Sequence, residues 1–267
     1  MNGLKRYARG ARALVSDPRT GLEVVRPKRY IFIQSHMRSY SSLLCHILNS
    51  NPEVAGYVET HRSYKGTSDL WRLKQTVFDT AAAETGGRYV LDKVLHNRST
   101  IDPVLLRRDN VYVVFSLREP VRTVQSTVAM ARSLDPDDWK VDPLRVVRYY
   151  IKRVDHLRRL ALLEYSHATY IDAQDLIDDT PRVLSELTAF LDLSEPLREE
   201  YQTSKLTGVP TYGDPSEYIK SGNIVRTRQD YSDIEVPAAE LAEAVEAYER
   251  AVEVLSELRS GPLDPAS

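Results

Sequence analysis

Short runs of apolar residues alternate with amphipathic stretches along about the first 195 residues of this chain. The runs are rich in β-branched and aromatic residues, which is typical of strands buried on both faces. They predict strands at Arg29–Gln34, Glu53–Val58, Arg88–Leu91, Asn110–Leu117 and Ala168–Ile171. The amphipathic stretches predict helices at Ser39–Ser50, from Pro120 to about Arg132, at Leu144–Leu163, from a cap at Asp179 to about Leu191, and at Pro237–Leu258.

This alternation predicts a three-layer α/β fold, with helices on both faces of a central parallel sheet of four or five strands. The length of 267 residues suits one such domain. We expect it to span residues 29–260, between a basic arm at 1–28 and a tail at 261–267. Residues 202–232 are polar and rich in Gly and Pro, so a long ordered loop is expected there. In such folds, ligands bind at the carboxyl ends of the strands.

Charge and cysteine content narrow the class of protein. The formal net charge of −2 disfavours a general nucleic-acid binder. The basic arm is consistent both with a solvated segment and with contact to a membrane surface. No stretch is apolar enough to span a bilayer. The single cysteine, Cys45, lies among apolar helix residues and is expected to be a buried thiol. Together these features favour a cytoplasmic protein.

Polar residues gather where the first strand meets the first helix. Arg38, Ser39, Ser41 and Ser42 stand in this turn. A forked cation, hydroxyl donors and the free N–H groups of a helix start form a site for phosphate or sulfate. The alternative is that Ser39 only caps the helix and Arg38 is solvated. The turn lacks G-x-x-x-x-G-K-[ST], so it is not an ordinary nucleoside-triphosphate loop.

Two further constellations point to anion binding. Arg118 ends the strongest predicted strand, and Arg122 and Ser126 follow at helical spacing. In the late loop, Lys220, Ser221 and the N–H of Gly222 are suited to meet an anion, although a plain surface loop fits equally well.

Taken in order, these motifs resemble the sulfotransferase superfamily that uses 3′-phosphoadenosine 5′-phosphosulfate (PAPS). Arg38-Ser39-Tyr40-Ser41-Ser42 is similar to the family loop R-S-G-T-T/S, which grips the 5′-phosphosulfate. Arg118 and Ser126 match the family's Arg and Ser, eight residues apart, which hold the 3′-phosphate. The late loop looks like the family's Gly-Asp segment that closes over the nucleotide. The resemblance implies a P-loop-like fold, PAPS as co-substrate, and donor-binding roles for Arg38–Ser42, Arg118, Ser126, Lys220, Ser221 and Gly222.

The same resemblance, which includes carbohydrate and tyrosylprotein sulfotransferases, implies that Glu59 is the catalytic base. His61 is the competing base, because a histidine serves in other sulfotransferases. Lys93 is expected to neutralise charge on the transferring group. No cluster with metal-ligand spacing is apparent along the chain, so no metal is expected. One departure is Tyr40, which stands where the family has Gly and would be strained if that position requires a positive φ.

The segments 60–87 and 133–150 are expected to line the acceptor side, where Tyr57, Tyr64, Trp71 and Trp139 are candidates to stack on an acceptor. A carbohydrate, a glycolipid or another small-molecule hydroxyl is favoured over a protein tyrosine. Two alternatives stay open: a small-molecule kinase with a P-loop-like fold, and a catalytically silent protein that binds a nucleotide or glycan.

Overall fold

The strands of the computed structural model, which describes residues 26–56, 59–80, 87–204, 207–209, 213–227 and 229–259, form one parallel sheet. They are β1 (Arg29–Gln34), β2 (Val54–Ala55), β3 (Tyr89–Val94), β4 (Val111–Leu117) and β5 (His167–Asp172). Their order across the sheet is β2-β3-β1-β4-β5, with every neighbouring pair parallel. This confirms the predicted α/β fold with a central parallel sheet.

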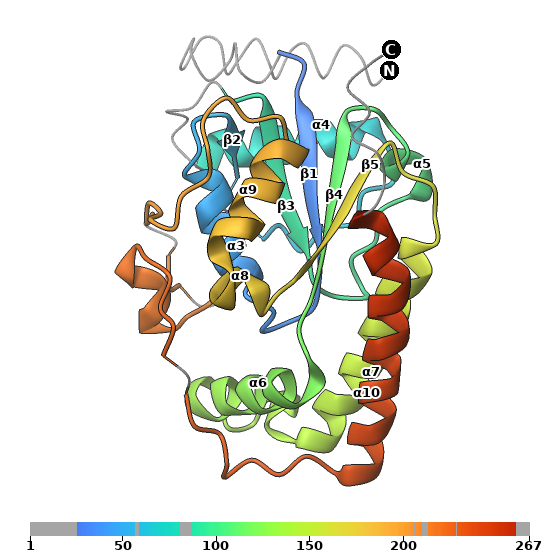
Figure 1. Ribbon diagram of the computed structural model, residues 1–267, viewed down its shortest axis with the longest axis vertical. Coiled ribbons are helices and arrows are strands. Elements are labelled where there is room, and N and C mark those ends of the chain that lie inside the picture. The colour runs from blue at the N-terminus through green and yellow to red at the C-terminus, as the bar shows by residue number, and fades with distance from the viewer. Residues whose placement is uncertain are drawn as a thin grey trace.

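The helices flank the sheet, with α3, α8 and α9 on one side and α7 and α10 on the other, as Figure 1 shows. They are α3 (Ser41–Asn49), α4 (Thr67–Thr80), α5 (Pro103–Leu106), α6 (Pro120–Leu134), α7 (Pro143–Ala161), α8 (Asp175–Asp178), α9 (Thr180–Phe190) and α10 (Ala238–Ser256). Three short 3-10 helices are η1 (Trp139–Val141), η2 (Glu217–Ser221) and η3 (Glu257–Arg259).

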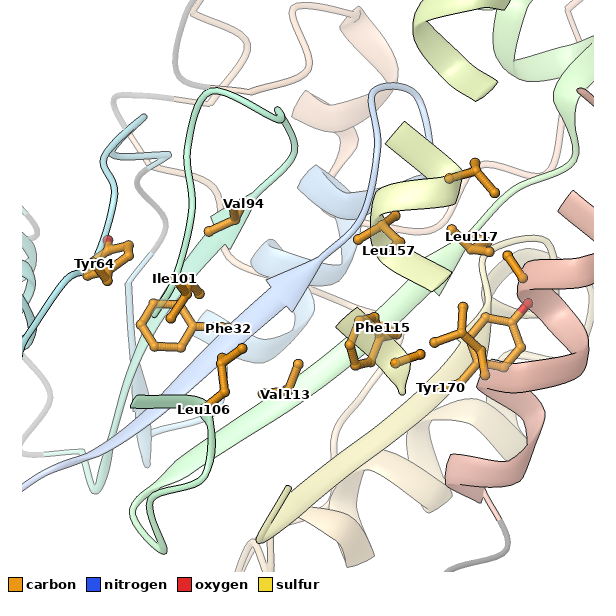
Figure 2. Packing of buried hydrophobic residues seen from close by; sticks show 14 of the residues in the cluster. Phe32, Tyr64, Val94, Ile101, Leu106, Val113, Phe115, Leu117, Leu157 and Tyr170 are labelled. Atoms are coloured by element: carbon orange, nitrogen blue, oxygen red, sulfur yellow. The ribbon is translucent and has the colours of Figure 1, made fainter. Parts of the chain in front are cut away.

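Side chains of β1 alternate between the two faces of the sheet, and this alternation produces two hydrophobic clusters. Phe32 belongs to the cluster that includes α4, α5, α6, α7 and α10, whereas Ile31 and Ile33 belong to the cluster that includes α3, α8 and α9. Figure 2 shows the first cluster, in which Phe32 of β1 and Phe115 of the neighbouring β4 lie on the same face of the sheet as Leu157 of α7. The sheet is thus covered on both faces, which leaves the carboxyl ends of the strands for a site.

Several element boundaries differ from the predicted ones. The helix expected from Ser39 begins at Ser41, and β3 extends beyond Leu91 to Val94. Residues 67–80 form α4, for which no helix was predicted; Leu70, Leu73 and Val77 are buried there at helical spacing. Asp179 occupies the N-cap position of α9, but its carboxylate makes no capping bond and pairs instead with Arg182.

The predicted arm and tail fall almost entirely outside the described residues, which begin at residue 26 and end at residue 259. Cys45 is buried, as expected. Among the described helices, none combines the length and the apolar character that crossing a bilayer requires.

Candidate active site

A cavity of about 1030 Å³ lies at the carboxyl ends of β1, β3 and β4, where the parallel strands deliver their following loops. Arg38 and Ser42 line it from the segment after β1, Lys93 from the end of β3, and Arg118 from the residue after β4. Glu59, from the segment after β2, completes the set. Five residues predicted to act in one site are therefore brought together.

The loop between β1 and α3 is held in an unusual backbone shape. Arg38 and Tyr40 both have positive φ, at 60° and 57°. Each costs roughly 1–2 kcal/mol for a residue with a Cβ, so the surrounding contacts must impose it. Tyr40 is the N-cap of α3 and supplies no side-chain cap, so the first-turn N–H groups stay available to an anion. The strain expected for a non-glycine residue at position 40 is therefore present.

Ser39 stabilises the inside of this loop and does not line the cavity. Its hydroxyl lies within hydrogen-bond distance of two acceptors, the carbonyl of His36 at 2.7 Å and the hydroxyl of Ser35 at 2.6 Å. The Ser35 hydroxyl donates in turn to the carbonyl of Ser116 on β4, at 2.5 Å. Ser41 and Ser42, in contrast, line the cavity.

His36 connects the first loop to the second. Its Nε2 accepts a hydrogen bond from the backbone N–H of Arg118 at 3.0 Å, and its Nδ1 is 2.9 Å from the carbonyl of Met37. Burial lowers the pKa of His36 to about 4, so the ring is neutral and donates from Nδ1. His36 is thus a hydrogen-bonding residue of the loop and not an exposed base.

Asp214 joins the late loop to the first loop. Its carboxylate pairs with Arg38 at 2.8 Å, and its backbone N–H donates to the hydroxyl of Ser42 at 3.0 Å. Burial alone would raise the pKa of Asp214, but the Arg38 guanidinium outweighs it and lowers that pKa. The late loop is therefore anchored by an ionised carboxylate at the entrance of the cavity.

Arg118 is a buried cation with neutral partners. The residue is 6% exposed, and its guanidinium donates to the carbonyl of Arg38 at 3.0 Å and to the hydroxyl of Tyr40 at 2.8 Å. Its Nε has no hydrogen-bond partner, and no carboxylate pairs with it, among the residues that the structure describes. Burial lowers the pKa of Arg118; the nearby Tyr40 opposes that shift and Arg38 adds to it. A guanidinium in this state strongly favours an incoming anion.

Of the two residues that follow Arg118 at helical spacing, one lines the cavity and the other does not. Arg122 lines the cavity and donates to the carbonyl of Gln229 at 2.6 Å. Ser126 is buried in α6, where its hydroxyl donates weakly to the Thr123 carbonyl at 3.4 Å, and it does not line the cavity.

The predicted late-loop residues also lie outside the lining. Lys220 pairs with Glu217 at 2.7 Å, and the hydroxyl of Ser221 donates to the Tyr218 carbonyl at 2.7 Å. Gly222 ends η2 with φ 73° and is not a lining residue. The same segment reaches the cavity through other residues, namely Asp214, Ser216, Tyr218 and Asn223.

Glu59 is the centre of a charged cluster at the base of the cavity. It is 8% exposed, and its Oε2 lies 3.2 Å from Nζ of Lys93. Its Oε1 lies 3.4 Å from Nδ1 of His61 and 3.9 Å from Nε2 of His96. The ammonium of Lys93 also donates to the hydroxyl of Ser42 at 2.9 Å, which links this cluster to the first loop.

Asp92 of β3 fixes the chain beside Glu59. Its carboxylate accepts the backbone N–H of Thr60 at 3.1 Å and the Thr60 hydroxyl at 2.6 Å, and the hydroxyl of Tyr64 also donates to it. Burial raises the pKa of Asp92 to about 6, although these hydrogen bonds oppose the rise. Asp92 acts through Thr60 and therefore positions Glu59 without touching the cavity.

His96 is a member of this cluster that sequence analysis missed. Its Nδ1 lies 2.7 Å from the hydroxyl of Tyr149 on α7, and burial lowers its pKa to about 4, against the raising effect of Glu59. The ligand atoms of Glu59, His61 and His96 all lie within 4.8 Å of one another. No spacing along the chain joins these three residues, and only the sheet brings His96 next to the other two.

Two aromatic rings form the part of the cavity wall next to His96. Trp139 and Tyr149 line it with ring centroids 5.3 Å apart. Of the other aromatic candidates, Tyr64 is buried in the core against Phe32, Trp71 packs against the core, and residue 57 lies outside the described residues. The segment 133–150 thus lines the cavity, whereas 60–87 reaches it through His61.

Helix α7 supports both sides of the site with neighbouring residues. The hydroxyl of Tyr150 donates to the carbonyl of Arg118 at 2.7 Å. Arg153, fully buried, donates to the carbonyls of Ser35 and Val94 at the ends of β1 and β3. Tyr149, on the same helix, contacts His96. One helix therefore fixes the ends of three strands.

Comparison with known proteins was made at three levels. No family model matches the sequence, and no curated protein matches it. Among solved structures, the sulfotransferase domain from the curacin biosynthetic pathway superposes with a TM-score of 0.56 at 20% identity, covering 86% of this chain and 98% of that domain.

Two more distant structures are also similar. Sulfotransferase STF1 from Mycobacterium tuberculosis H37Rv gives a TM-score of 0.47 at 13% identity, over 90% of this chain and 80% of the other. Retinol dehydratase, in complex with androsterone and the inactive cofactor PAP, gives 0.43 at 12% identity, over 91% and 86%. The likeness to the curacin domain shows that this chain has the sulfotransferase fold, a P-loop-like α/β fold.

Proposed function

We propose that this protein is an enzyme that transfers a sulfuryl group from PAPS to a hydroxyl of a carbohydrate, glycolipid or other small molecule. The observation that carries the proposal is Arg118, a buried cation whose described partners are neutral. It lies in the same cavity as Ser41 and Ser42 of the uncapped α3 N-terminus. A nucleotide with a phosphosulfate at one end and a 3′-phosphate at the other supplies an anion to each place. The sulfotransferase fold supports the same assignment.

The donor residues follow from this arrangement. Ser41, Ser42 and the N–H groups of α3 would hold the 5′-phosphosulfate, with Arg38 and Lys93 nearby. Arg118 would hold the 3′-phosphate, assisted by Arg122 from the next turn. Roles in donor binding for Ser39, Ser126, Lys220, Ser221 and Gly222 stay predictions from the sequence, because these residues are not among those lining the cavity.

Glu59 would be the general base. Its buried carboxylate takes the proton of the acceptor hydroxyl while that oxygen attacks the sulfur in line. The bond between sulfur and the bridging oxygen breaks, and its electron pair leaves with adenosine 3′,5′-bisphosphate. Lys93, paired with Glu59 and bonded to Ser42, would offset the charge that develops on the leaving oxygen. His61 remains the alternative base; we favour Glu59 because it lies between Lys93 and both imidazoles.

The acceptor would enter on the side of Trp139 and Tyr149, whose rings suit the face of a sugar or an apolar ring. This supports a small-molecule or glycan acceptor. A cytoplasmic location is also part of the proposal and is supported by the buried free thiol of Cys45.

The test is calorimetric titration with adenosine 3′,5′-bisphosphate beside ATP–Mg²⁺, followed by an acceptor screen with labelled PAPS. We expect the bisphosphate to bind and ATP–Mg²⁺ to bind much more weakly, since the first loop lacks a Walker lysine. Glu59→Gln should keep the bisphosphate affinity and lose turnover by about 100-fold or more. Glu186→Gln, an exposed carboxylate of α9, is the matched control.

Each outcome has a definite meaning. Failure of the bisphosphate to bind would overturn the proposal, and tight binding of ATP–Mg²⁺ would point to a small-molecule kinase. Binding without turnover, with Glu59→Gln indistinguishable from wild type, would point to a silent nucleotide-binding protein. The strained Tyr40 against Arg118 is the structural feature that favours this last reading.

A further inference from the structure

Glu59, His61 and His96 form a set of possible metal ligands, of which the proposed function uses Glu59 as the base and gives His96 no role. One carboxylate and two imidazoles converge, and all three residues line the cavity. The distances from Oε1 of Glu59 to the two ring nitrogens are 3.4 and 3.9 Å. Ligands around a tetrahedral Zn²⁺ with bonds near 2.0–2.1 Å are about 3.3 Å apart. The cluster is therefore close to the spacing that such an ion requires.

The glutamate divides its two oxygens between different partners. Oε2 faces the ammonium of Lys93, and Oε1 faces both histidines. An ion at Oε1 would thus bind without breaking the pair with Lys93. The positive charge of Lys93 weakens the binding of that ion, but Lys93 lies beside Oε2, the carboxylate oxygen that does not contact the ion.

Other residues orient the two histidines. Tyr149 lies 2.7 Å from Nδ1 of His96, so an Nδ1–H that donates to this hydroxyl leaves the lone pair of Nε2 directed at Glu59. Between Glu59 and His61, Thr60 is fixed by its two bonds to Asp92. His61 itself has φ 52°, and its side chain is 36% exposed, which lets the ring turn to close the remaining gap.

We propose that Glu59, His61 and His96 bind one divalent transition-metal ion of the Zn²⁺ class, with the fourth position open to the cavity. Two nitrogen ligands select Zn²⁺ or Co²⁺ over Mg²⁺ and Ca²⁺, which prefer oxygen. The bound ion occupies the carboxylate oxygen that would otherwise take the acceptor's proton. Zn²⁺ is therefore an inhibitor of sulfuryl transfer, a consequence that rests on the proposed function, whereas the binding itself does not.

The test uses the whole chain after treatment with a chelator and dialysis. Titration with ZnCl₂ is followed by calorimetry, and the visible absorption of added Co²⁺ reports tetrahedral coordination. We expect a single saturable site in the wild type and an affinity at least about 10-fold lower in His61→Ala and His96→Ala. His156→Ala, a half-buried histidine of α7 outside the cluster, is the matched control and should bind like the wild type.

A milder variant guards against misfolding. Tyr149→Phe keeps the aromatic ring and removes only the hydroxyl that contacts His96. We expect it to lower the affinity for Zn²⁺ about 10-fold while the melting temperature stays close to that of the wild type. Zinc binding that is equally strong in His61→Ala and His96→Ala, or lost equally in His156→Ala, would overturn the proposal. Zinc binding without bisphosphate binding would support this site and count against the sulfotransferase function. Bisphosphate binding without zinc binding would support the sulfotransferase function and overturn the metal site.

Discussion

Replacing Arg118 by methionine should weaken ligand binding strongly and leave the stability of the free protein nearly unchanged. The residue is 6% exposed, and its hydrogen bonds go to neutral oxygens, so in the free protein Arg118 is a buried cation without an ion-pair partner among the described residues. Removing that charge removes a desolvation cost, and methionine fills a similar volume. The carbonyl of Arg38 and the hydroxyl of Tyr40 lose a donor at a cost of about 1–3 kcal/mol, which offsets this gain. The free energy of unfolding of the ligand-free protein should therefore stay within about 2 kcal/mol of the wild type.

The same substitution should weaken the bisphosphate strongly. A charge-assisted hydrogen bond contributes about 1.5–3 kcal/mol, and a unit charge pair at 4 Å contributes about 4 kcal/mol at an effective dielectric constant of 20. A net loss of about 3 kcal/mol corresponds to a roughly 150-fold higher Kd. Calorimetric titration gives the Kd, and urea unfolding with and without the bisphosphate gives both stabilities.

Arg148→Met is the control for replacing an arginine. Its side chain pairs with Glu240 on the surface and is 60% exposed. The free energy of unfolding and the free energy of bisphosphate binding should therefore both stay within about 1 kcal/mol of the wild type. If Arg118→Met lowered the stability of the free protein by more than about 2 kcal/mol, or left the bisphosphate affinity within 10-fold, Arg118 would be a structural residue and our reasoning would be refuted.

Three further predictions concern residues that shape the site. Tyr40→Gly should be more stable than Tyr40→Ala by about 1 kcal/mol in urea unfolding, because φ is 57° and only glycine adopts it freely. Arg153→Met should lower the free energy of unfolding by at least about 3 kcal/mol, because carbonyls at the ends of two strands lose their buried donor. Asp92→Asn should remove one contribution to the pH dependence of stability between pH 4 and 6. Burial raises the folded pKa of Asp92 to about 6, so the stability that its protonated carboxyl contributes is complete below the unfolded pKa of 3.8 and is lost, by up to about 3 kcal/mol, as pH rises through 6.

Each of these predictions has a contrary outcome. Equal stability of the two Tyr40 variants would mean that the backbone relaxes to negative φ. A loss below 1 kcal/mol for Arg153→Met would mean that water reaches the freed carbonyls. Parallel stability curves for wild type and Asp92→Asn would mean that the carboxyl of Asp92 has the same pKa in the folded and unfolded states.

The parts of the fold that were predictable from sequence are those in which one local pattern dominates. β1 and β4 have apolar centres and are bounded by Pro, Asn and Arg, so the sequence predicts their ends to within a residue. The α6 helix begins at Pro120, as expected, because proline costs nothing at a first helical position. The sequence does not predict α4, because the apolar face of this helix is narrow.

The candidate site was only partly predictable for a related reason. Arg118 follows β4 directly, Arg38 and Ser42 stand in the turn and first helical residues after β1, and parallel strands deliver their ends to one edge. His96 and Asp214 carry no motif that points to the cavity, because their place depends on how distant segments pack. The positive charge of Lys220 suggests an anion contact in the sequence, but in the structure the ammonium pairs with the nearby Glu217.

The support that α7 gives to both sides of the cavity sets a limit for engineering. Tyr149, Tyr150 and Arg153 hold His96, Arg118 and the β1 end from one rigid element. Directed changes of acceptor preference on this helix would therefore also disturb the donor half. Libraries aimed at a new acceptor are better placed in η1, around Trp139, which faces the cavity without holding a strand end.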